Sequence, residues 1–479
     1  RKFAQFAKLP VLDPAGPREA WAMAGWAFEL SERLGLPVIL RPTTRTCHAR
    51  QGVETGIETP VPGKPAGFLK SPSWVILPGL TARRHPWLNR QQEEARALFE
   101  PSAFNELIVD ETSDLGIIAG GVAYNYVREV LPLAGLGASV LKVGTPYPLP
   151  HGPVRKMLAR CRRILVVEEQ EPVIEDQVIA LAWRECAAAA VSGKHDQVVP
   201  REGELNVEKV RAVIARFLGR EEPAAAPVPS LELPVRSPVL CAGCPHRASF
   251  YIFKKAAEGT DAVFTGDIGC YTLGAAPPLA AVDTCLCMGA SITVATGLHR
   301  VEPGRRQVAF LGDSTFFHTG IPGLINAVYN RADITVVVLD NRTTAMTGHQ
   351  PHPGLSRTAM GPARTSLDIA RLARACGVEL VREVDPYDLQ AGREAAGEAL
   401  FHPGPAVVIM RRDCALLAEK ATPYTVNAQD CAGCGACVEE LGCPAIGRAD
   451  DAVYITADCI GCGVCAQICP AGAIRRAGE

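Results

Sequence analysis

The chain has 479 residues, of which 48% are hydrophobic, enough to bury several cores and to predict about three domains. Its 49 basic and 51 acidic residues give a net charge of -2, which excludes a basic footprint for nucleic acid and a polybasic membrane anchor. No stretch approaches the roughly 18 apolar residues of a membrane span, and the start of the sequence lacks the features of a signal peptide. The sequence therefore predicts a cytoplasmic multidomain protein.

The N-terminal part of the chain carries one helix signal followed by one strand signal. Residues 18–34 are helix-forming and amphipathic, the pattern stops at Gly35, and an apolar run follows at 38–40. This pair predicts the last αβ unit of a larger domain. We expect a remnant of that domain over residues 1–60.

A second α/β region follows. Residues 114–168 repeat strand, turn and helix signals, which predicts a small parallel α/β domain over residues 100–220. This region resembles the transketolase C-terminal domain. Residues 219–238 are rich in proline, alanine and charge, so we expect a linker over residues 221–238.

From residue 261 onward, apolar runs alternate with glycine-rich or helix-forming stretches. The runs are DAVFTGDIG, QVAFLGDS, ITVVVLDN and PAVVIMRR. The alternation predicts a second parallel sheet with helices on both faces, within a domain over residues 239–422. Ligands of such sheets bind at the carboxyl ends of the strands, so we expect the active site there.

The end of the chain holds eight of the eighteen cysteines. They form two runs, C-x2-C-x2-C-x5-C-P from Cys431 and C-x2-C-x2-C-x3-C-P from Cys459, and the second has the bacterial ferredoxin spacing. In two-cluster ferredoxins the fourth cysteine of each run crosses to the other cluster. We therefore predict a small α+β ferredoxin domain over residues 425–479 with two four-iron four-sulfur clusters. The ligand sets are Cys431, Cys434, Cys437 and Cys469, and Cys459, Cys462, Cys465 and Cys443.

Two alternatives compete with iron and sulfur at these cysteines. Disulfide frameworks are typical of small secreted domains rather than of long chains with clustered C-x2-C pairs. Tetrahedral zinc binds C-x2-C pairs but gains nothing from the Cys-Pro endings or from the repeated run. The first run carries two extra residues before Cys443, which we attribute to a local loop insertion rather than to a lost ligand.

Polar residues follow two of the apolar runs of the second sheet. GDS at 312–314 ends one run, and DN at 340–341 ends the next. Asp and Asn side chains at strand ends supply oxygen ligands for Mg²⁺, which bridges a diphosphate, and the backbone at Gly312 and the following helix N-terminus brings amides to the anion. Ordinary turn chemistry is the alternative for such short signals.

The same residues resemble the Gly-Asp-[Gly/Ser] and [Asn/Asp]-Asn signature of thiamine diphosphate enzymes. The resemblance implies that Mg²⁺ is held by Asp313, Asn341 and a main-chain carbonyl near Thr343. The cofactor contacts that it implies are Gly312, Asp313, Ser314, Asn341, Thr343, Met288 and Gly289.

Four more cysteines lie in predicted loops of this domain: Cys241, Cys244, Cys270 and Cys414. With CAGCPHRASFYIFKKA, GDIGCYTLG, DTCLCMGASITVATG and GDSTFFHTGIPGLINAVYN, the chain resembles the 2-oxoacid:ferredoxin oxidoreductase family, most closely the alpha subunits of indolepyruvate ferredoxin oxidoreductases. The resembling stretches also include LPVILRPTTRTCHARQGVE, LGIIAGGVAYNYVREVL and the terminal ferredoxin, so they span nearly the whole chain in the family's order. The resemblance implies that these cysteines hold a third four-iron four-sulfur cluster near thiamine diphosphate, and buried thiols are the alternative.

The six remaining cysteines have no partner spacing, so we expect them to be small, buried apolar residues. They are Cys47, Cys161, Cys186, Cys285, Cys287 and Cys376.

The family resemblance also implies a reaction and its partners. Thiamine diphosphate acts as an electron sink while an arylpyruvate loses carbon dioxide, the clusters remove two electrons one at a time, and coenzyme A takes the acyl group. The implied partners are ferredoxin and a smaller beta (gamma-domain-like) subunit. The family's Glu that contacts the aminopyrimidine ring has no match here, so we expect a chain that is catalytically incomplete alone, its pyrimidine-binding domain truncated or supplied by a separate polypeptide.

Several side chains are candidates for catalysis and substrate binding. His246 and His318 are candidates for contacts with the diphosphate or for acids near the reacting carbon, and polar loop histidines without such a role are the alternative. An arylpyruvate needs an apolar pocket and a cation for its carboxylate, while packing aromatics and a surface Arg are the alternative. The candidates for the pocket and the cation are Tyr271, Phe316, Phe317, Arg45 and His48.

Three rival functions fit parts of the pattern. A pyruvate or branched-chain 2-oxoacid:ferredoxin oxidoreductase differs in substrate, and the fusion of thiamine domain and terminal ferredoxin favours the indolepyruvate type. A non-catalytic electron-transfer subunit would not need both Asp313 and Asn341. A thiamine decarboxylase that releases aldehydes would not need the cysteines, because its reaction has no electron acceptor.

Overall fold

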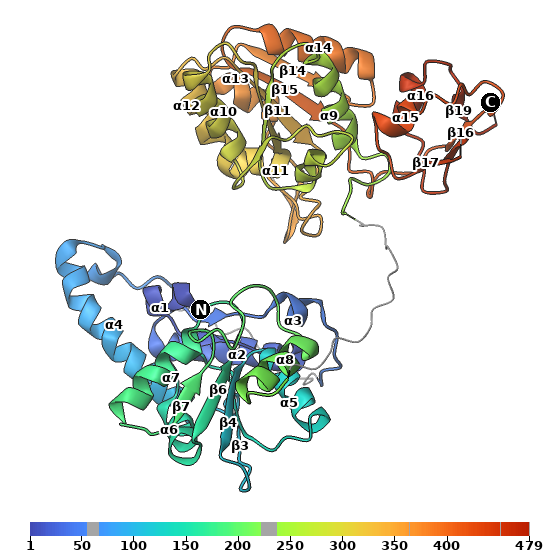
Figure 1. Cartoon of the computed structure of the whole chain (residues 1–479). Helices are drawn as coiled ribbons and strands as arrows, with labels where there is room; N and C mark the ends of the chain where they lie inside the picture. The colour runs from blue at the N-terminus through green and yellow to red at the C-terminus, as the bar shows by residue number, and fades with distance from the viewer. Residues whose placement is uncertain (55–66, 222–236, 364, 451, 479) are drawn as a thin grey trace. The chain divides into compact units, whose positions relative to one another are not determined.

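Figure 1 shows a computed structural model of the chain, which describes residues 1–54, 67–221, 237–363, 365–450 and 452–478. The chain divides into two compact units, Arg1–Leu231 and Glu232–Glu479. Each unit is built around a largely parallel sheet flanked by helices, which confirms the predicted α/β class. Most of the linker expected over 221–238 lies outside the described residues, and the predicted domain boundaries stay predictions.

The first unit contains a five-stranded sheet of order β3-β5-β4-β6-β7. Strands β4, β5, β6 and β7 run parallel, and β3 is antiparallel to β5. Side chains alternate between two cores, so Ile117 of β4 packs toward α5 and α8 whereas Ile118 packs toward α6 and α7. The strands are β3 (Leu107–Ile108), β4 (Leu115–Gly120), β5 (Ser139–Val143), β6 (Arg163–Val167) and β7 (Ala190–Ser192).

Helices on both faces of this sheet and a small N-terminal subdomain complete the unit. The flanking helices are α5 (Ala123–Leu133), α6 (His151–Arg160), α7 (Val173–Arg184) and α8 (Val207–Phe217). The N-terminal elements are α1 (Lys2–Ala7), β1 (Val11–Leu12), α2 (Pro17–Leu34), β2 (Ile39–Leu40), α3 (Thr44–His48), η1 (Pro72–Trp74) and α4 (Pro78–Phe99). The helix predicted at 18–34 is confirmed as α2, and β1 pairs in parallel with β2.

Buried charges hold the start of α7 in the first unit. The Glu168 carboxylate accepts the backbone N–H groups of Val173, Ile174 and Glu175, which satisfies donors that a helix N-terminus leaves free. Lys194 is 1% exposed and donates to a backbone carbonyl. Burial lowers the pKa of Lys194 to about 8.

The second unit contains a six-stranded sheet of order β14-β15-β11-β10-β8-β9, with every neighbouring pair parallel. The four strands expected from the apolar runs are confirmed as β8, β10, β11 and β15, and β9 and β14 extend the two edges. The strands are β8 (Val263–Gly266), β9 (Thr284–Cys285), β10 (Gln307–Gly312), β11 (Ile334–Asp340), β14 (Leu380–Val384) and β15 (Ala406–Arg411).

Two cores sandwich this second sheet (Figure 1). Phe310 of β10 packs with α9 and α14 on one face, whereas Leu311 packs with α10, α12 and α13 on the other. The helices are α9 (Pro245–Ala256), η2 (Cys270–Ala275), α10 (Ala290–Val301), α11 (Asp313–Thr315), η3 (Phe316–Gly320), α12 (Ile321–Tyr329), α13 (Ile369–Ala375) and α14 (Leu389–Phe401). A two-stranded hairpin, β12 (Arg357–Thr358) with β13 (Gly361–Pro362), lies between β11 and α13 in the chain.

A small C-terminal module of four short strands and two helices completes the second unit. Its elements are β16 (Tyr424–Val426), α15 (Ala436–Glu439), β17 (Ile446–Ala449), β18 (Ala452–Ile455), α16 (Val464–Ile468) and β19 (Ile474–Arg476). Strand β16 pairs with β19, and β17 pairs with β18, both antiparallel. Buried residues of the module, such as Leu441 and Val464, belong to the same core as Phe310.

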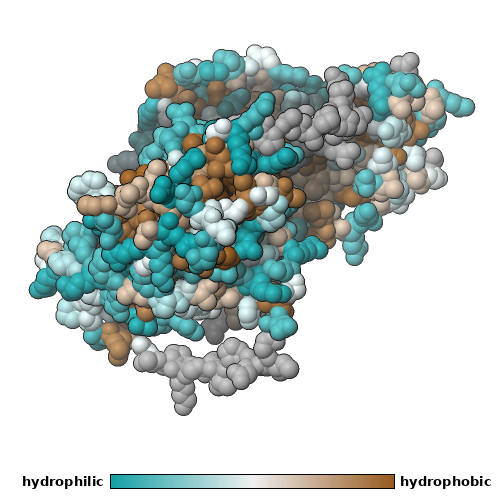
Figure 2. Space-filling model, turned by 60° about the horizontal axis from the view of Figure 1, so that its bottom comes forward, coloured by the Kyte–Doolittle hydropathy of each residue, from teal (hydrophilic) through white to brown (hydrophobic). Residues whose placement is uncertain are grey.

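The surface carries scattered hydrophobic residues among hydrophilic ones on the face shown in Figure 2. Among the helices of the described residues, none has both the length and the apolar character needed to cross a membrane.

The buried Lys194 predicts a pH dependence of the first unit's stability. Its pKa is about 8 in the folded chain and about 10.4 in an unfolded one, so the unfolded state binds more protons between these values. The free energy of unfolding is therefore expected to rise with pH over that window, by up to about 1.4 kcal/mol per pH unit. Urea unfolding at pH 7.5, 9 and 10 measures the slope.

Lys194→Met is expected to abolish this contribution, since it removes the titrating group. The matched control is Lys156→Met on the exposed face of α6, which should leave the slope unchanged. A Lys194→Met variant with the wild-type slope would contradict the assignment.

Candidate active site

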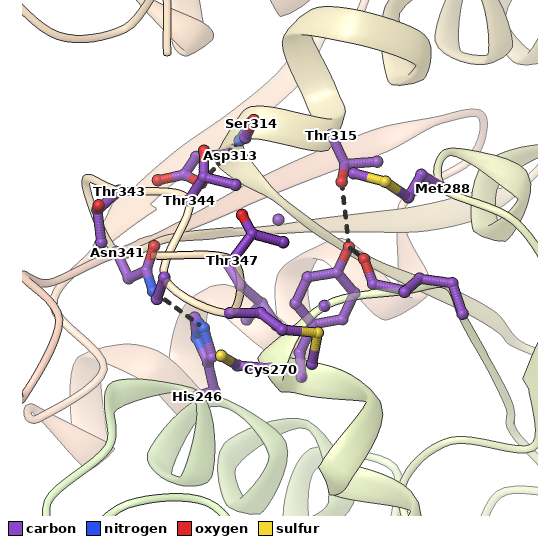
Figure 3. Close-up of a pocket in the computed structure, with 17 residues that line it drawn as sticks. His246, Cys270, Met288, Asp313, Ser314, Thr315, Asn341, Thr343, Thr344 and Thr347 are labelled. Atoms are coloured by element: carbon purple, nitrogen blue, oxygen red, sulfur yellow. Dashed lines mark hydrogen bonds between the residues drawn. The ribbon is translucent and has the colours of Figure 1, made fainter. Parts of the chain in front are cut away.

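A pocket opens at the carboxyl ends of β8, β10 and β11, where the parallel sheet was expected to bind ligands (Figure 3). Strands β10 and β11 pair with Gly312 opposite Leu339, so Asp313 and Asn341 leave adjacent strands at the same edge. The lining residues are His246, Ile268, Gly269, Cys270, Tyr271, Met288, Gly312, Asp313, Ser314, Thr315, Leu339, Asn341, Thr343, Thr344, Ala345, Met346 and Thr347. The sequence motifs at 312–314 and 340–341 therefore meet in one cavity.

Asp313 is buried on the wall of this pocket. Its Oδ1 accepts the backbone N–H of Ser314 at 2.7 Å, and its Oδ2 lies 3.0 Å from Nε2 of His352. Burial raises the pKa of Asp313, and the neighbouring His352 opposes that shift. Positive charge beside the carboxylate would stabilise its ionised form.

The neighbouring Asp340 faces a different partner. Nε of Arg411 donates to its Oδ2 at 2.7 Å, and the backbone N–H of Arg342 donates to its Oδ1 at 3.2 Å. Asp340 is therefore satisfied by protein groups, although one of its oxygens lies within 4.8 Å of ligand atoms of Asp313 and His352.

The pocket fits a diphosphate with its cation, on two observations. Within the described residues, Oδ2 of Asp313 and Oγ1 of Thr343 are buried atoms that make no aligned hydrogen bond, and buried polar atoms of this kind usually have a partner. At Gly312 a Cβ would stand 2.8 Å from the ring of Tyr271, so only glycine leaves the backbone this close to the pocket wall. A cation would satisfy the carboxylate, and the hydroxyl could then donate to an anion.

Asp267, at the end of β8, organises the opposite wall and was missed by the sequence reasoning. It is fully buried and accepts hydrogen bonds from the backbone N–H of Gly289 at 2.9 Å, from Oγ of Ser291 at 3.0 Å and from the hydroxyl of Tyr271. These contacts hold the loop that carries Met288 against the pocket. The signal was present, because Gly-Asp ends this strand as it ends β10.

The candidate catalytic histidines separate in the structure. His246 is buried, lines the pocket, and has a pKa that burial lowers to about 4, so its imidazole is neutral at physiological pH. His318 is exposed within η3 and is not among the lining residues.

The substrate-binding candidates separate as well. Tyr271 lines the pocket, whereas Phe316 is buried in the core and Phe317 stacks on His352, and neither phenylalanine is in the loop expected for it. Arg45 lies in the first unit, where its Nε is 3.0 Å from Glu204. His48 ends α3 of that unit and is exposed.

The four loop cysteines gather beside the pocket. Cys270 lines the pocket, and the nearby thiols of Cys414 and Cys241 help to raise its pKa. The thiol of Cys241 likewise helps to raise the pKa of Cys244. Desolvation raises the pKa of Cys244, Cys270 and Cys414, to about 12 for Cys244. Thiols of this kind stay protonated until a metal ion displaces the proton.

The eight terminal cysteines lie in two groups, and the crossed ligand sets stay a prediction. The thiol of Cys437 is influenced by Cys469, Cys434 and Cys431, and burial raises its pKa. Burial raises the pKa of Cys465 to about 12, with Cys462, Cys443 and Cys459 adding to the shift. Cys437 of the other group also helps to raise the pKa of Cys465, so the two groups are neighbours.

The loop of Cys241 and Cys244 approaches the second terminal group at Gly243. Gly243 lies between Cys241 and Cys244 at a φ of 64°, and a Cβ there would stand 2.3 Å from Ile460 and 3.7 Å from Cys462. A side chain at this position would both strain the backbone and push the two cysteine loops apart.

The two extra residues before Cys443 have a structural explanation. Nη1 of the buried Arg247 donates to the carbonyls of Leu441 at 2.9 Å and of Gly442 at 2.7 Å, and Nζ of Lys255 lies 3.1 Å from Glu440. The longer loop reaches α9 and fixes the C-terminal module to the second sheet's core. It is a docking loop, which we define as residues 438–443.

The six cysteines expected to be buried apolar residues do not behave uniformly. Cys161 is buried in the core and Cys376 is partly buried, as expected. The expectation is wrong for Cys47, Cys186, Cys285 and Cys287, which are exposed because they lie in loops or at element ends rather than on an apolar face.

Comparison with known proteins identifies the parts of the second unit. A family model described as "Thiamine pyrophosphate enzyme, C-terminal TPP binding domain" matches residues 267–410, and one described as "4Fe-4S binding domain" matches residues 452–475. The indolepyruvate oxidoreductase subunit IorA of Methanothermobacter marburgensis is 43% identical and covers 100% of this chain and 79% of that protein. The subunit IorA of Pyrococcus horikoshii is 42% identical and covers 93% of this chain and 74% of that protein.

The chain belongs to the indolepyruvate oxidoreductase subunit IorA family. This membership confirms the predicted family and class of enzyme, an oxidoreductase that depends on thiamine diphosphate and transfers electrons through a ferredoxin-type domain. Both relatives are named as subunits of an indolepyruvate oxidoreductase. A solved 2-oxoglutarate:ferredoxin oxidoreductase from Magnetococcus marinus is 20% identical, with a TM-score of 0.33 over 38% of this chain and 66% of that chain.

The docking loop generates a prediction about the C-terminal module. Arg247→Met removes a buried guanidinium that donates to two loop carbonyls, and a hydrogen bond that involves a charged group contributes about 1.5–3 kcal/mol. We expect faster amide hydrogen exchange across residues 425–478 in this variant, measured by mass spectrometry on the anaerobic protein.

The matched control is Arg382→Met, which breaks a solvent-exposed ion pair with Glu398 in the same unit. Exposed pairs contribute little, so exchange of the module should not change. Equal exchange in the wild type and the Arg247→Met variant would refute the anchoring role of Arg247.

Proposed function

We propose that this chain is the alpha subunit of an enzyme that oxidatively decarboxylates arylpyruvates, indolepyruvate among them, to aryl-acetyl-coenzyme A. An arylpyruvate and the thiol of coenzyme A give the thioester, carbon dioxide and one proton, and the two electrons released pass one at a time to ferredoxin. The observation that carries the proposal is Cys270, which lines the pocket and also neighbours Cys414 and Cys241. A cysteine group at the cofactor pocket favours oxidation over simple decarboxylation.

The cofactor in this proposal is thiamine diphosphate with Mg²⁺, which supplies the electron sink for decarboxylation. Asp313, Asn341 and the backbone near Thr343 are the proposed cation ligands, and their support is that the buried carboxylate of Asp313 and the buried amide of Asn341 line one pocket at the same sheet edge. Gly312, Ser314 and Met288, with Gly289 behind it, are the proposed walls of the cofactor site.

The proposed electron path uses three groups of cysteines. Cys241, Cys244, Cys270 and Cys414 are the proposed ligands nearest the pocket. Cys459, Cys462, Cys465 and Cys443 follow, and Cys431, Cys434, Cys437 and Cys469 end the path. The neighbour relations among the thiols and the close approach of Gly243 to Ile460 support this order.

An aromatic substrate is supported by the apolar part of the pocket. Ile268, Met288, Leu339 and Met346 line it together with Tyr271, and such walls suit an aryl side chain better than the methyl group of pyruvate. No lysine or arginine occurs among the lining residues of the described chain, so the cation for the carboxylate stays a prediction at Arg45 or His48. Ferredoxin, coenzyme A and a smaller beta subunit are the proposed partners.

Iron content tests the third cysteine group. About twelve irons per chain are expected from three four-iron clusters and about eight from two. Cys270→Ser removes one proposed ligand, so the anaerobically purified variant should lose about four irons per chain. Cys376→Ser is the control, because Cys376 is assigned to no cluster, and an iron content of about eight in both wild type and Cys270→Ser would refute the third cluster.

Substrate preference tests the aryl pocket. Burying an aromatic side chain contributes about 1.5–3 kcal/mol, so kcat/KM for indolepyruvate should exceed that for pyruvate by at least about tenfold. Ferredoxin reduction by the assembled complex with coenzyme A measures both values. A higher kcat/KM for pyruvate would favour the pyruvate-type alternative.

A further inference from the structure

Each of the two proposed side-chain ligands of the cation touches a buried histidine. Nε2 of His352 lies 3.0 Å from Oδ2 of Asp313, and Nδ2 of Asn341 lies 3.4 Å from Nε2 of His246. We propose that His352 and His246 are positioning residues that orient the two ligands before the cation binds, His352 as a donor and His246 as an acceptor. The inference rests on the proposed cofactor site and extends it to residues outside the ligand set.

The tautomer of His352 follows from its other nitrogen. Nδ1 accepts the backbone N–H of Gly354 at 3.2 Å, and a neutral imidazole that accepts at one nitrogen carries its proton on the other. Nε2 therefore bears a hydrogen and faces the carboxylate of Asp313. A protonated nitrogen has no lone pair for a metal, so His352 holds a ligand rather than serving as one, although it lies close enough to be mistaken for one.

The ring of His352 is held in place by its surroundings. It stacks on Phe317 with ring centroids 5.6 Å apart and an interplanar angle of 25°, and it is 6% exposed. Its N–H and the backbone N–H of Ser314 approach different oxygens of the Asp313 carboxylate. In the chain as described, the His352 contact is close but not aligned as a hydrogen bond, and such contacts commonly tighten when ligands bind.

Nε2 of His246 carries no proton, in contrast to Nε2 of His352. The amide nitrogen of Asn341 can only donate, so Nε2 of His246 must accept and carries no proton. This contact fixes which end of the amide faces the histidine. Figure 3 shows the amide oxygen of Asn341 on the side away from His246, where Asp313 and Thr343 lie. The histidine thereby presents the oxygen, which is the atom that Mg²⁺ prefers.

Residues that orient metal ligands typically change metal affinity by about 10–100-fold when they are replaced. His352→Phe keeps an aromatic ring for the stack on Phe317 but loses the N–H, whereas His352→Gln keeps an N–H donor and loses the ring. A donor role predicts that the Gln variant retains affinity and the Phe variant does not. A purely structural role predicts the reverse order.

The experiment titrates MgCl₂ into the anaerobic full chain with thiamine diphosphate in excess and measures the apparent Kd for Mg²⁺ by calorimetry. His352→Phe should raise this Kd by about 10–100-fold, and His352→Gln should stay close to wild type. For His246 the matched pair is His246→Leu, which loses the acceptor and should weaken binding, and His246→Gln, whose amide oxygen can accept and should restore it.

His299→Phe is the control, because His299 is an equally buried histidine on α10 that does not line the pocket. It should leave the Kd unchanged. Wild-type affinity in His352→Phe, or affinity in His352→Gln as low as in His352→Phe, would overturn the donor role. A wild-type chain that binds thiamine diphosphate without needing Mg²⁺ would instead overturn the proposed function.

Discussion

The parallel pairing of β10 with β11 is the constraint on which the site depends. The register places Gly312 opposite Leu339, so Asp313 and Asn341, which follow the two strands, lie at the same edge of the sheet. Buried apolar residues on both faces of these strands hold the pairing, and the hydrophobic effect favours it in proportion to the area removed from water. The polar chemistry of the pocket is therefore fixed by the apolar interior of the sheet.

The electron-transfer module depends on a second, more local constraint. Arg247 lies in the first turn of α9, directly after the loop of Cys241 and Cys244. Its guanidinium donates hydrogen bonds to two backbone carbonyls of the docking loop, next to Cys443. One side chain thus connects two cysteine loops that are far apart in the sequence. The docking loop turns the irregular spacing before Cys443 into the means by which the module is held near the pocket.

Features that depend on local sequence spacing could be predicted, whereas roles that depend on tertiary contacts could not. The cysteine runs, the strand ends at Asp313 and Asn341 and the α/β class were all predictable, because each depends on spacing within a few residues. His352, Asp267 and Arg247 were not, because their roles arise from partners brought near only by the folded sheet. The exposure of Cys285 and Cys287 was mispredicted because the lack of a partner spacing does not show whether a strand end or a loop position reaches solvent.

Burial has opposite consequences for the histidines and the cysteines around the pocket. Desolvation favours the neutral form of both, and a neutral His246 is already in the state that accepts a hydrogen bond. A neutral thiol at Cys244 or Cys465 must instead lose its proton before it can serve as the iron ligand proposed for it, since burial raises the pKa of each to about 12. Under the proposed ligand assignment iron displaces those protons, and Gly243, which has no side chain, leaves room for Ile460 beside Cys462.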